Sequence, residues 1–298
     1  SLERGVMVES LEVVPLRGSV LVGVAPLFEV EVGGQIVRSD RYRLGRARAE
    51  GATLFLELLP PKAGLPVVSL AIRATKAPVL SLQAKLVNTG QEALRPRLRL
   101  LSALPLRLGK GDWYFYPANP PLLSQRATRL RAIYGGAFPL QFVSLFNRRA
   151  GCGLYVMTRD SRAVFKRFLL RRERSGATAV GVEFWPDPLQ PGAAFETPPI
   201  DLGLNPGDWH GAFAAYKKWA AGWYRPLVPR KRWFRQVFFF RQDYIRAGLF
   251  DPKTRAYRFR EKVRKAREAF GGCDYLHIFD WGACGRRGRR RPSRRCGD

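Results

Sequence analysis

The sequence is poor in the residues from which disulfide scaffolds and metal sites are built. Its 298 residues include only 4 Cys and 2 His. A disulfide-built fold needs a much higher density of cysteine, so this class of protein is excluded. The cysteines, at positions 152, 273, 284 and 296, show no Cys-x-x-Cys spacing. Because two histidines are also too few for a zinc site, we expect no metal ion.

Long apolar runs and nucleotide-binding motifs are missing as well. A membrane-spanning helix needs about 18 or more apolar residues in a row, whereas the longest runs here, such as Val237–Phe240, have the length of a strand. There is no P-loop and no Gly-x-Ser-x-Gly motif. The glycines around Cys152 lack the third glycine of a dinucleotide fingerprint. We therefore predict no membrane span and no cofactor.

Acidic residues are scarce relative to basic ones. The chain has 24 Asp and Glu against 52 Lys and Arg, a formal net charge of +28. An excess of positive charge of this size is typical of proteins that bind a polyanion, so nucleic acid is one candidate partner. The excess is spread along the chain and steepens in residues 282–298, which hold 7 Arg and 1 Asp. A spread excess of Arg also follows from GC-rich coding, so we rank nucleic acid below carbohydrate.

Residues 1–205 carry the pattern of a mainly β domain. Phe28–Val32 alternates apolar and polar residues, meets Gly33-Gly34 and restarts at Gln35, which predicts a hairpin. Further strand-like runs occupy residues 53–58, 67–74, 79–87, 94–104, 142–146, 153–158 and 163–170. The segment Asp112–Pro117 is interpreted as an aromatic loop. Its Trp113 either packs in the core or offers a ring face to a sugar. Many strands without a long helical period predict a large antiparallel β-sandwich.

Residues 206–231 are predicted to form a linker helix. Aromatic residues recur at helical spacing at Phe213, Tyr216, Trp219 and Trp223, and Asp208 is a suitable N-cap. Prolines at positions 226 and 229 end the helical pattern.

Residues 232–281 change pattern again. An apolar strand at 236–240, a helix at Phe259–Phe270 that ends at Gly271, and a second apolar strand at 275–281 form a βαβ unit. The helix is predicted to bury Val263, Ala266 and Phe270 on its inner face. This order predicts the start of an α/β barrel. The Arg-rich tail, residues 282–298, has no apolar period. It is interpreted as a disordered basic arm or, preferably, as an out-of-frame translation.

Several ordered motifs together resemble a known architecture; they are residues 86–90 (Leu-Val-Asn-Thr-Gly), 135–142, 151–160, 206–210 (Pro-Gly-Asp-Trp-His) and 216–219. In this order the chain resembles bacterial proteins of glycoside-hydrolase type from an uncharacterised family near the α-galactosidase-like enzymes. In that architecture a galactose-mutarotase-like β-supersandwich precedes a (β/α)8 barrel. The resemblance covers about residues 50–281. It implies a barrel cut after its second strand, with the catalytic carboxylates beyond the cut, so none is assigned.

Barrel active sites form at the carboxyl ends of the strands. Arg241 follows the first predicted barrel strand, and Asp280 and Trp281 follow the second. We predict that Asp280 hydrogen-bonds sugar hydroxyls and that Trp281 stacks on a sugar ring; a structural, capping Asp280 is the alternative. We do not favour the hypothesis that Asp243 and Asp280 form a catalytic pair. The histidines, at positions 210 and 277, are expected to be structural.

The prediction is therefore a fragment of a carbohydrate-active enzyme, inactive alone, whose sandwich binds sugar or supports a sugar-processing barrel. The first alternative is a non-catalytic carbohydrate-binding protein. The second is a basic nucleic-acid-binding protein, whose affinity would fall steeply with salt because counterions are released.

Overall fold

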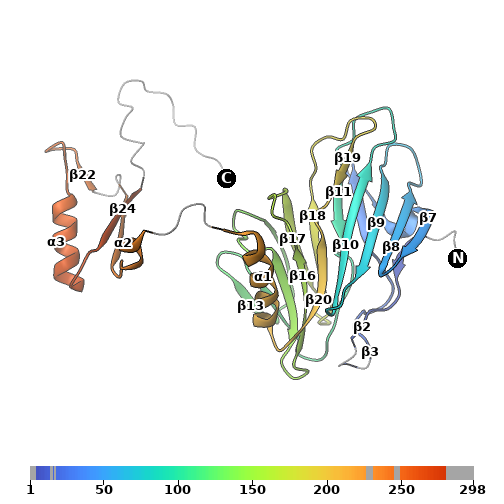
Figure 1. Cartoon of the computed structure of the whole chain (residues 1–298), viewed down its shortest axis with the longest axis horizontal. Helices are drawn as coiled ribbons and strands as arrows, with labels where there is room; N and C mark the ends of the chain where they lie inside the picture. Colours follow the sequence, from blue (N-terminus) through green and yellow to red (C-terminus); the bar gives the residue numbers. More distant parts are fainter. Residues whose placement is uncertain (1–4, 14–15, 17, 226–230, 245–248, 280–298) are drawn as a thin grey trace. The chain divides into compact units, whose positions relative to one another are not determined.

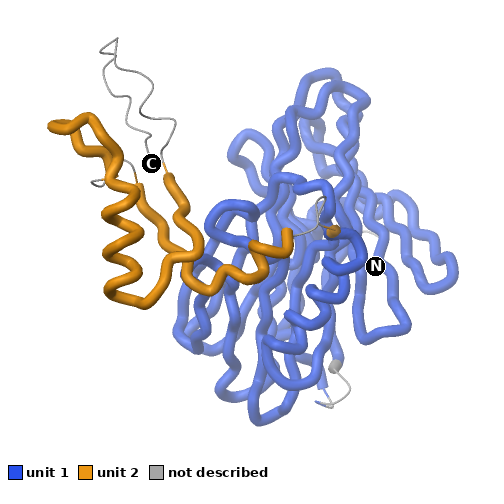
Figure 2. Tube along the Cα trace, turned by 60° about the vertical axis from the view of Figure 1, so that its left-hand side comes forward, with its two compact units in different colours: residues 1–224 blue, residues 225–298 orange. Residues whose placement is uncertain are grey.

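The computed structural model of the chain describes residues 5–13, 16, 18–225, 231–244 and 249–279. The chain forms two compact units, Ser1–Tyr224 and Arg225–Asp298 (Figure 2). Strands dominate the first unit, and the second combines short strands with helices (Figure 1).

Unit 1 contains a large antiparallel sheet with the strand order β13-β12-β15-β16-β20-β10-β9-β8-β7, and β19 also pairs with β10. Its strands are β7 (Arg43–Glu50), β8 (Thr53–Leu59), β9 (Val67–Ala74), β10 (Val79–Val87), β12 (Trp113–Tyr116), β13 (Leu122–Ser124), β15 (Phe142–Asn147), β16 (Cys152–Thr158), β19 (Ala194–Glu196) and β20 (Ile200–Pro206). Strands far apart in the sequence are neighbours, because β20 lies between β16 and β10.

A smaller antiparallel sheet has the order β14-β17-β18-β11-β5-β6. Its strands are β5 (Phe28–Val32), β6 (Gln35–Arg38), β11 (Arg97–Leu100), β14 (Thr128–Ile133), β17 (Lys166–Arg172) and β18 (Thr178–Phe184). Two short pairs, β1 (Met7–Val8) with β4 (Ala25–Pro26) and β2 (Glu12–Val13) with β3 (Gly18–Ser19), and the 3-10 helix η2 (Ser39–Arg41) complete the unit.

The two sheets share one hydrophobic core. Alternate residues of the large sheet, such as Leu58 and Leu86, join Phe168 and Val182 of the small sheet in a single buried cluster. Each such side chain contributes about 1.5–3 kcal/mol by leaving water. The large antiparallel β-sandwich predicted from the sequence is therefore confirmed.

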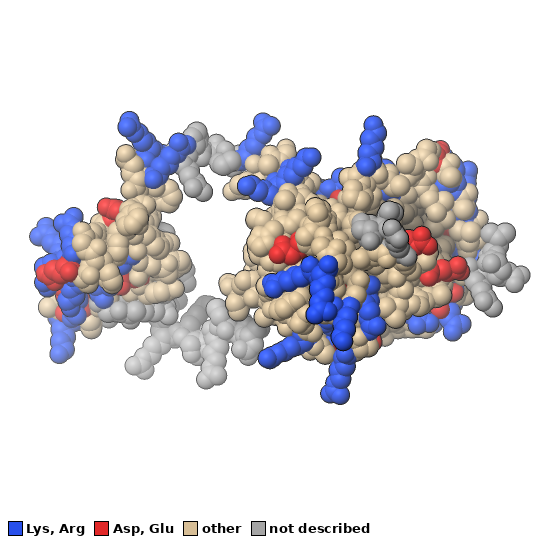
Figure 3. Space-filling view, turned by 90° about the horizontal axis from the view of Figure 1, so that it is seen from below, with Lys and Arg blue, Asp and Glu red and all other residues tan. Residues whose placement is uncertain are grey.

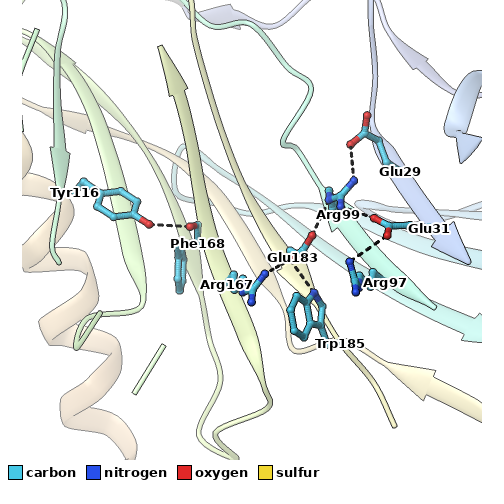
Figure 4. Close-up of polar contacts among 9 residues, drawn as sticks. All are labelled: Glu29, Glu31, Arg97, Arg99, Tyr116, Arg167, Phe168, Glu183 and Trp185. Atoms are coloured by element: carbon cyan, nitrogen blue, oxygen red, sulfur yellow. Dashed lines mark hydrogen bonds and ion pairs between the residues drawn. The ribbon is translucent and has the colours of Figure 1, made fainter. Parts of the chain in front are cut away.

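The outer face of the small sheet carries a polar network centred on Glu183 (Figure 4). The Glu183 carboxylate accepts hydrogen bonds from Arg99 Nε at 2.7 Å and from Trp185 Nε1 at 2.7 Å. Arg99 also reaches Glu31, with Nη2 2.6 Å from Oε2. The Trp185 ring lies against the guanidinium group of Arg167, whose Cζ is 3.7 Å from the ring centroid. Cross-strand side chains thus hold β5, β11, β17 and β18 together on this face.

Helix α1 (Trp209–Trp223) covers part of the outer face of the large sheet (Figure 1). The Asp208 carboxylate accepts a hydrogen bond from the backbone N–H of His210, which confirms the predicted N-cap. Trp209 stacks on Phe115 with ring centroids 4.3 Å apart, and Tyr216 contacts Phe142. The helix therefore uses its aromatic face to cover β15, β16 and β20.

Unit 2 contains a parallel strand pair, β21 (Phe240–Tyr244) with β24 (Tyr275–Phe279), joined through helix α3 (Phe259–Phe270). Gly271 ends α3 with a φ of 77°, a conformation that favours glycine. The predicted βαβ unit is confirmed. The short helix α2 (Arg232–Arg235) and the pair β22 (Phe250–Asp251) with β23 (Ala256–Tyr257) complete the described residues of the unit.

The prediction of the first strand of unit 2 was wrong in its position. The apolar run at 236–240 is mostly outside β21, and Phe238 is 94% exposed. A parallel strand needs a partner, and β24 begins only at Tyr275, opposite Phe240. The backbone N–H groups of Phe238 and Phe239 instead donate to the Asp274 carboxylate. Arg241 and Asp243 consequently lie within β21 rather than after it.

Three other predictions need correction. The segment predicted as an aromatic loop is the strand β12, because Tyr114 and Tyr116 point into the core. The Tyr116 hydroxyl donates to the carbonyl of Phe168 at 2.8 Å (Figure 4). The run at 94–104 forms a strand only over β11, since Leu101 takes a φ of 64°. Phe270, predicted on the inner face of α3, is 66% exposed.

Candidate functional site

A shallow pocket of about 380 Å³ lies on the outer face of the large sheet, over β7, β8, β9, β10 and β19. Helix α1 packs on other strands of this sheet and leaves these strands uncovered (Figure 1). The pocket is lined by Arg46, Arg48, Phe55, Leu56, Glu57, Ser69, Leu70, Ala71, Gln83, Ala84, Lys85 and Glu196. We call this surface the open face.

Strand register arranges the open face in rows. In the first row, Arg46 pairs with Glu57, Glu57 with Ser69, Ser69 with Lys85, and Lys85 with Glu196. Residues directly opposite each other in an antiparallel pair have side chains on the same face, within about 5.5 Å at Cβ. The row therefore places four charged side chains of alternating sign across five strands, with the neutral Ser69 in the middle. Four of its five members are exposed.

The second row is less charged. Arg48 pairs with Phe55, Phe55 with Ala71, and Ala71 with Gln83. The guanidinium group of Arg48 lies 5.0 Å from the centroid of the Phe55 ring. The Gln83 side chain is fixed by a hydrogen bond from Nε2 to the carbonyl of Thr197. The row thus holds one aromatic ring on β8 and, two strands away across Ala71, a positioned amide on β10.

A third row borders the pocket and contains a buried carboxylate. Arg73 pairs with Ser81 and Ser81 with Asp201, which is 5% exposed. Arg159 reaches into this row, with Nε 2.9 Å from Asp201 Oδ2 and Nη2 donating to Ser81 Oγ at 2.9 Å. Burial raises the pKa of Asp201, and the positive charge of Arg159 acts in the opposite direction.

Glycine is required next to this row. A Cβ atom on Gly203 would lie 2.1 Å from the ring carbon Cζ of Tyr155, its cross-strand partner. Only glycine lets this ring lie flat across β20. The ring separates the third row from the part of the sheet that α1 covers.

The open face alternates hydrogen-bond donors and acceptors over one aromatic side chain. Planar carboxylate, amide and guanidinium groups bind paired hydroxyls, and an apolar ring packs against C–H groups. The arrangement suits a neutral polyhydroxylated ligand. Sequence analysis missed these residues, because each strand alone shows only ordinary alternation and the rows arise from register between strands.

The site residues predicted from the sequence belong to different parts of the chain. Trp113 lies in unit 1, on β12, and Arg241 lies in unit 2, on β21. The Arg241 guanidinium forms an ion pair with the Asp243 carboxylate, with Nε 2.6 Å from Oδ2. Asp280 and Trp281 lie outside the described residues. The roles of all four residues stay predictions.

The histidines occupy a helix start and a strand. His210 Nδ1 lies 2.8 Å from Asp208 Oδ1, and the His277 ring packs against Phe279 with centroids 4.4 Å apart. Among the residues that the structure describes, no group of three or more His, Cys, Asp or Glu could hold a metal ion. No helix among the described residues has both the length and the apolar character needed to cross a membrane.

Motif residues that carried the sequence resemblance meet in a buried polar network. Gln141 Nε2 donates to the carbonyl of Asp160 at 2.8 Å, and Thr158 Oγ1 donates to Gln141 Oε1. Lys166 Nζ lies 2.5 Å from Asp160 Oδ2 and 4.3 Å from the centroid of the Tyr134 ring. These residues connect β15, β16 and β17, so their role is structural.

No protein-family model matches the sequence, and no curated protein does. The structure is similar to those of GH36 alpha-galactosidases. AgaB from Geobacillus stearothermophilus is 14% identical with a TM-score of 0.44, over 91% of this chain and 40% of that enzyme. AgaA from the same organism is 16% identical with a TM-score of 0.41, over 74% and 35%.

The alpha-galactosidase from Lactobacillus brevis is 14% identical with a TM-score of 0.43, over 88% of this chain and 38% of the enzyme. Variants of AgaA have been solved in complex with stachyose and with raffinose. The present chain spans less than half the length of these enzymes.

Proposed function

We propose that this chain is part of a carbohydrate-active enzyme of glycoside-hydrolase type. The observation that carries the proposal is the order of its elements. An antiparallel sandwich is followed by the aromatic helix α1 and then by the parallel unit β21-α3-β24. A strand, a helix and a parallel strand form the repeat of a (β/α)8 barrel. In this proposal the sandwich comes first and the sugar-processing barrel begins at β21.

The sandwich binds carbohydrate through its open face. Its first row offers charged groups of alternating sign, and its second row offers the Phe55 ring and, two strands away, the fixed amide of Gln83. Galactose-containing oligosaccharides such as raffinose and stachyose are the first ligands to test. The barrel contributes its own sugar contacts, for which Asp280, Trp281 and Arg241 stay the proposed residues.

The chain by itself does not hydrolyse glycosides in this proposal. Hydrolysis needs two carboxyl groups that flank the glycosidic bond. The carboxylates of Asp243, Asp251 and Asp274 in unit 2 each accept hydrogen bonds from an arginine or from backbone N–H groups. Arg258 and the Lys253 backbone lower the pKa of Asp251 to about 2. Such a group is a poor proton donor near neutral pH.

Calorimetric titration of the full chain with raffinose and stachyose tests the binding step. We expect saturable binding that weakens roughly three- to tenfold in Gln83→Ala and in Phe55→Ala, as the loss of one contact predicts. Arg129→Ala, on β14 of the other sheet, is the matched control and should bind like the wild type. Equal binding by the wild type and both open-face variants would overturn the assignment.

A panel of aryl glycosides tests the catalytic step. The full chain should release no aryl alcohol above the rate of buffer alone, at any concentration tested. Turnover that resists dilution and repeated purification would contradict the proposal that this chain is inactive alone.

A further inference from the structure

Another pocket of unit 1, of about 400 Å³, lies apart from the open face and has three cationic residues among its seven lining residues. Its lining residues are Lys110, Gly111, Trp113, Gln125, Asn147, Arg148 and Arg149. None of them carries a carboxylate, and three carry a positive charge. The pocket belongs to the turn before β12 and to the turn that joins β15 to β16. We call it the cationic pocket.

A buried asparagine holds both turns in place. Asn147 is 3% exposed, and its Nδ2 donates to the carbonyl of Lys110 at 3.2 Å and to Asp112 Oδ1 at 2.7 Å. Its Oδ1 accepts hydrogen bonds from the backbone N–H groups of Arg149 and Ala150, each at 3.0 Å. The backbone that carries the cations is therefore positioned before any ligand arrives, which lowers the entropic cost of binding.

The charges of the cationic pocket are largely uncompensated. Lys110 and Arg149 make no ion pair with any carboxylate in the described part of the chain. Both oxygens of the neighbouring Asp112 are occupied by inward donors, the backbone N–H of Leu108 and the Asn147 amide. Asp208, at the start of α1, also interacts electrostatically with Arg148.

The cationic pocket also contains an aromatic ring. The guanidinium group of Arg148 lies 4.8 Å from the centroid of the Trp113 indole. A guanidinium held on an indole keeps its outer N–H groups free for a carboxylate or a sulfate, which it binds in a bidentate manner. The ring itself supplies apolar surface for the body of a ligand.

We propose that the cationic pocket binds an anionic carbohydrate, a sugar that carries a carboxylate or a sulfate group. The anionic group pairs with Lys110, Arg148 and Arg149, and the sugar ring packs beside Trp113. A neutral sugar suits the mixed charges of the open face, whereas the cationic pocket requires a negative charge. The inference goes beyond the proposed function, because it concerns a second ligand and different residues.

The test is titration of the full chain with an oligogalacturonide and with a sulfated galacto-oligosaccharide of the same length; raffinose serves as the neutral probe. At least one anionic sugar should bind about tenfold or more tightly than raffinose, and the Lys110→Gln/Arg149→Gln double variant should lose that advantage. The two anionic probes separate a carboxylate from a sulfate ligand. Both side chains are exposed, so the thermal unfolding curve should not change.

Figure 3 shows why a matched charge control is needed, since Lys and Arg side chains are abundant on the face of the molecule that it displays. Arg129→Gln/Arg131→Gln, on β14, removes the same two charges elsewhere and should leave the affinity unchanged. An equal loss in this control, or no preference for anionic sugar, would overturn the proposal.

Single-stranded DNA is the competing ligand class. Tighter binding of a DNA oligonucleotide than of either anionic sugar, abolished by the Lys110→Gln/Arg149→Gln change, would also overturn the proposal and assign the cationic pocket to nucleic acid. Gln83→Ala separates the two proposals of this chain. It should weaken raffinose binding and leave binding of the anionic sugar intact.

Discussion

Replacing Lys166 by methionine should strongly destabilise unit 1. The ammonium group and the Asp160 carboxylate are both completely buried, with Nζ 2.5 Å from Oδ2. Methionine has a similar length but no charge, so Asp160 would keep a buried negative charge without its counterion. Two backbone donors remain, the N–H groups of Arg162 at 2.8 Å and Val164 at 2.7 Å. Breaking a buried pair costs about 3–5 kcal/mol, and the remaining donors favour the lower part, about 3–4 kcal/mol.

Thermal unfolding followed by circular dichroism measures this effect. For a unit of this size the loss corresponds to a fall in Tm of roughly 6–16 °C. Lys76→Met, at an exposed turn position, is the control and should change stability by less than about 0.5 kcal/mol. The Lys166→Met/Asp160→Asn double variant should recover part of the loss, because it leaves no unpaired charge. A fall below about 1 kcal/mol in the single variant would refute the reasoning.

Three further predictions concern acidic residues of unit 1. Glu183→Gln keeps the shape of the side chain but removes the charge that Arg99 and Trp185 bind, so urea unfolding should show a loss of about 2–3 kcal/mol. Asp208→Ala should cost about 1 kcal/mol through the lost N-cap of α1, while Asp208→Asn retains most of it; a melt of helical circular dichroism distinguishes them. Burial raises the pKa of Asp201 above its ordinary value of 3.8, so the folded state binds this proton more tightly than the unfolded state does. The contribution of Asp201 to stability should therefore fall as the pH rises from about 4 through the folded pKa. The side chain introduced by Asp201→Asn does not titrate. The Tm of this variant should therefore rise relative to that of the wild type between pH 4 and pH 7. A relative fall over this pH range would contradict the prediction.

Local patterns in the sequence predict much of the sandwich. The strands β9 and β10 match their predicted ranges, and the Gly33-Gly34 hairpin forms between β5 and β6 with positive φ at both glycines. The N-cap of α1 was predictable for the same reason, since it depends on Asp208 and the residues that directly follow it. Each of these features is decided by residues close together in the chain.

The open face was not predictable, because it depends on which strands pair and in which register. In the sequence, Glu57 and Lys85 are polar positions of two separate strands. Only the pairing of both residues with Ser69 places them in one row. The dependence on strand pairing also explains why the first strand of unit 2 was predicted at the wrong position. Hydrophobicity favoured Phe238, but β21 starts where the partner strand begins.

The position of β20 has a consequence for how the chain folds during synthesis. β20 is the last strand of unit 1 to leave the ribosome, yet it lies in the middle of the large sheet, between β16 and β10. The sheet cannot form by adding each new strand to the one before it. Its strands β7 to β10 and its strands β12 to β16 are joined through β20, which begins only at residue 200. Closing the sheet joins segments far apart in the chain, which makes this a slow step. A nascent chain that stalls before β20 would present two unpaired strand edges to any other chain nearby, on β16 and on the part of β10 that β19 does not pair.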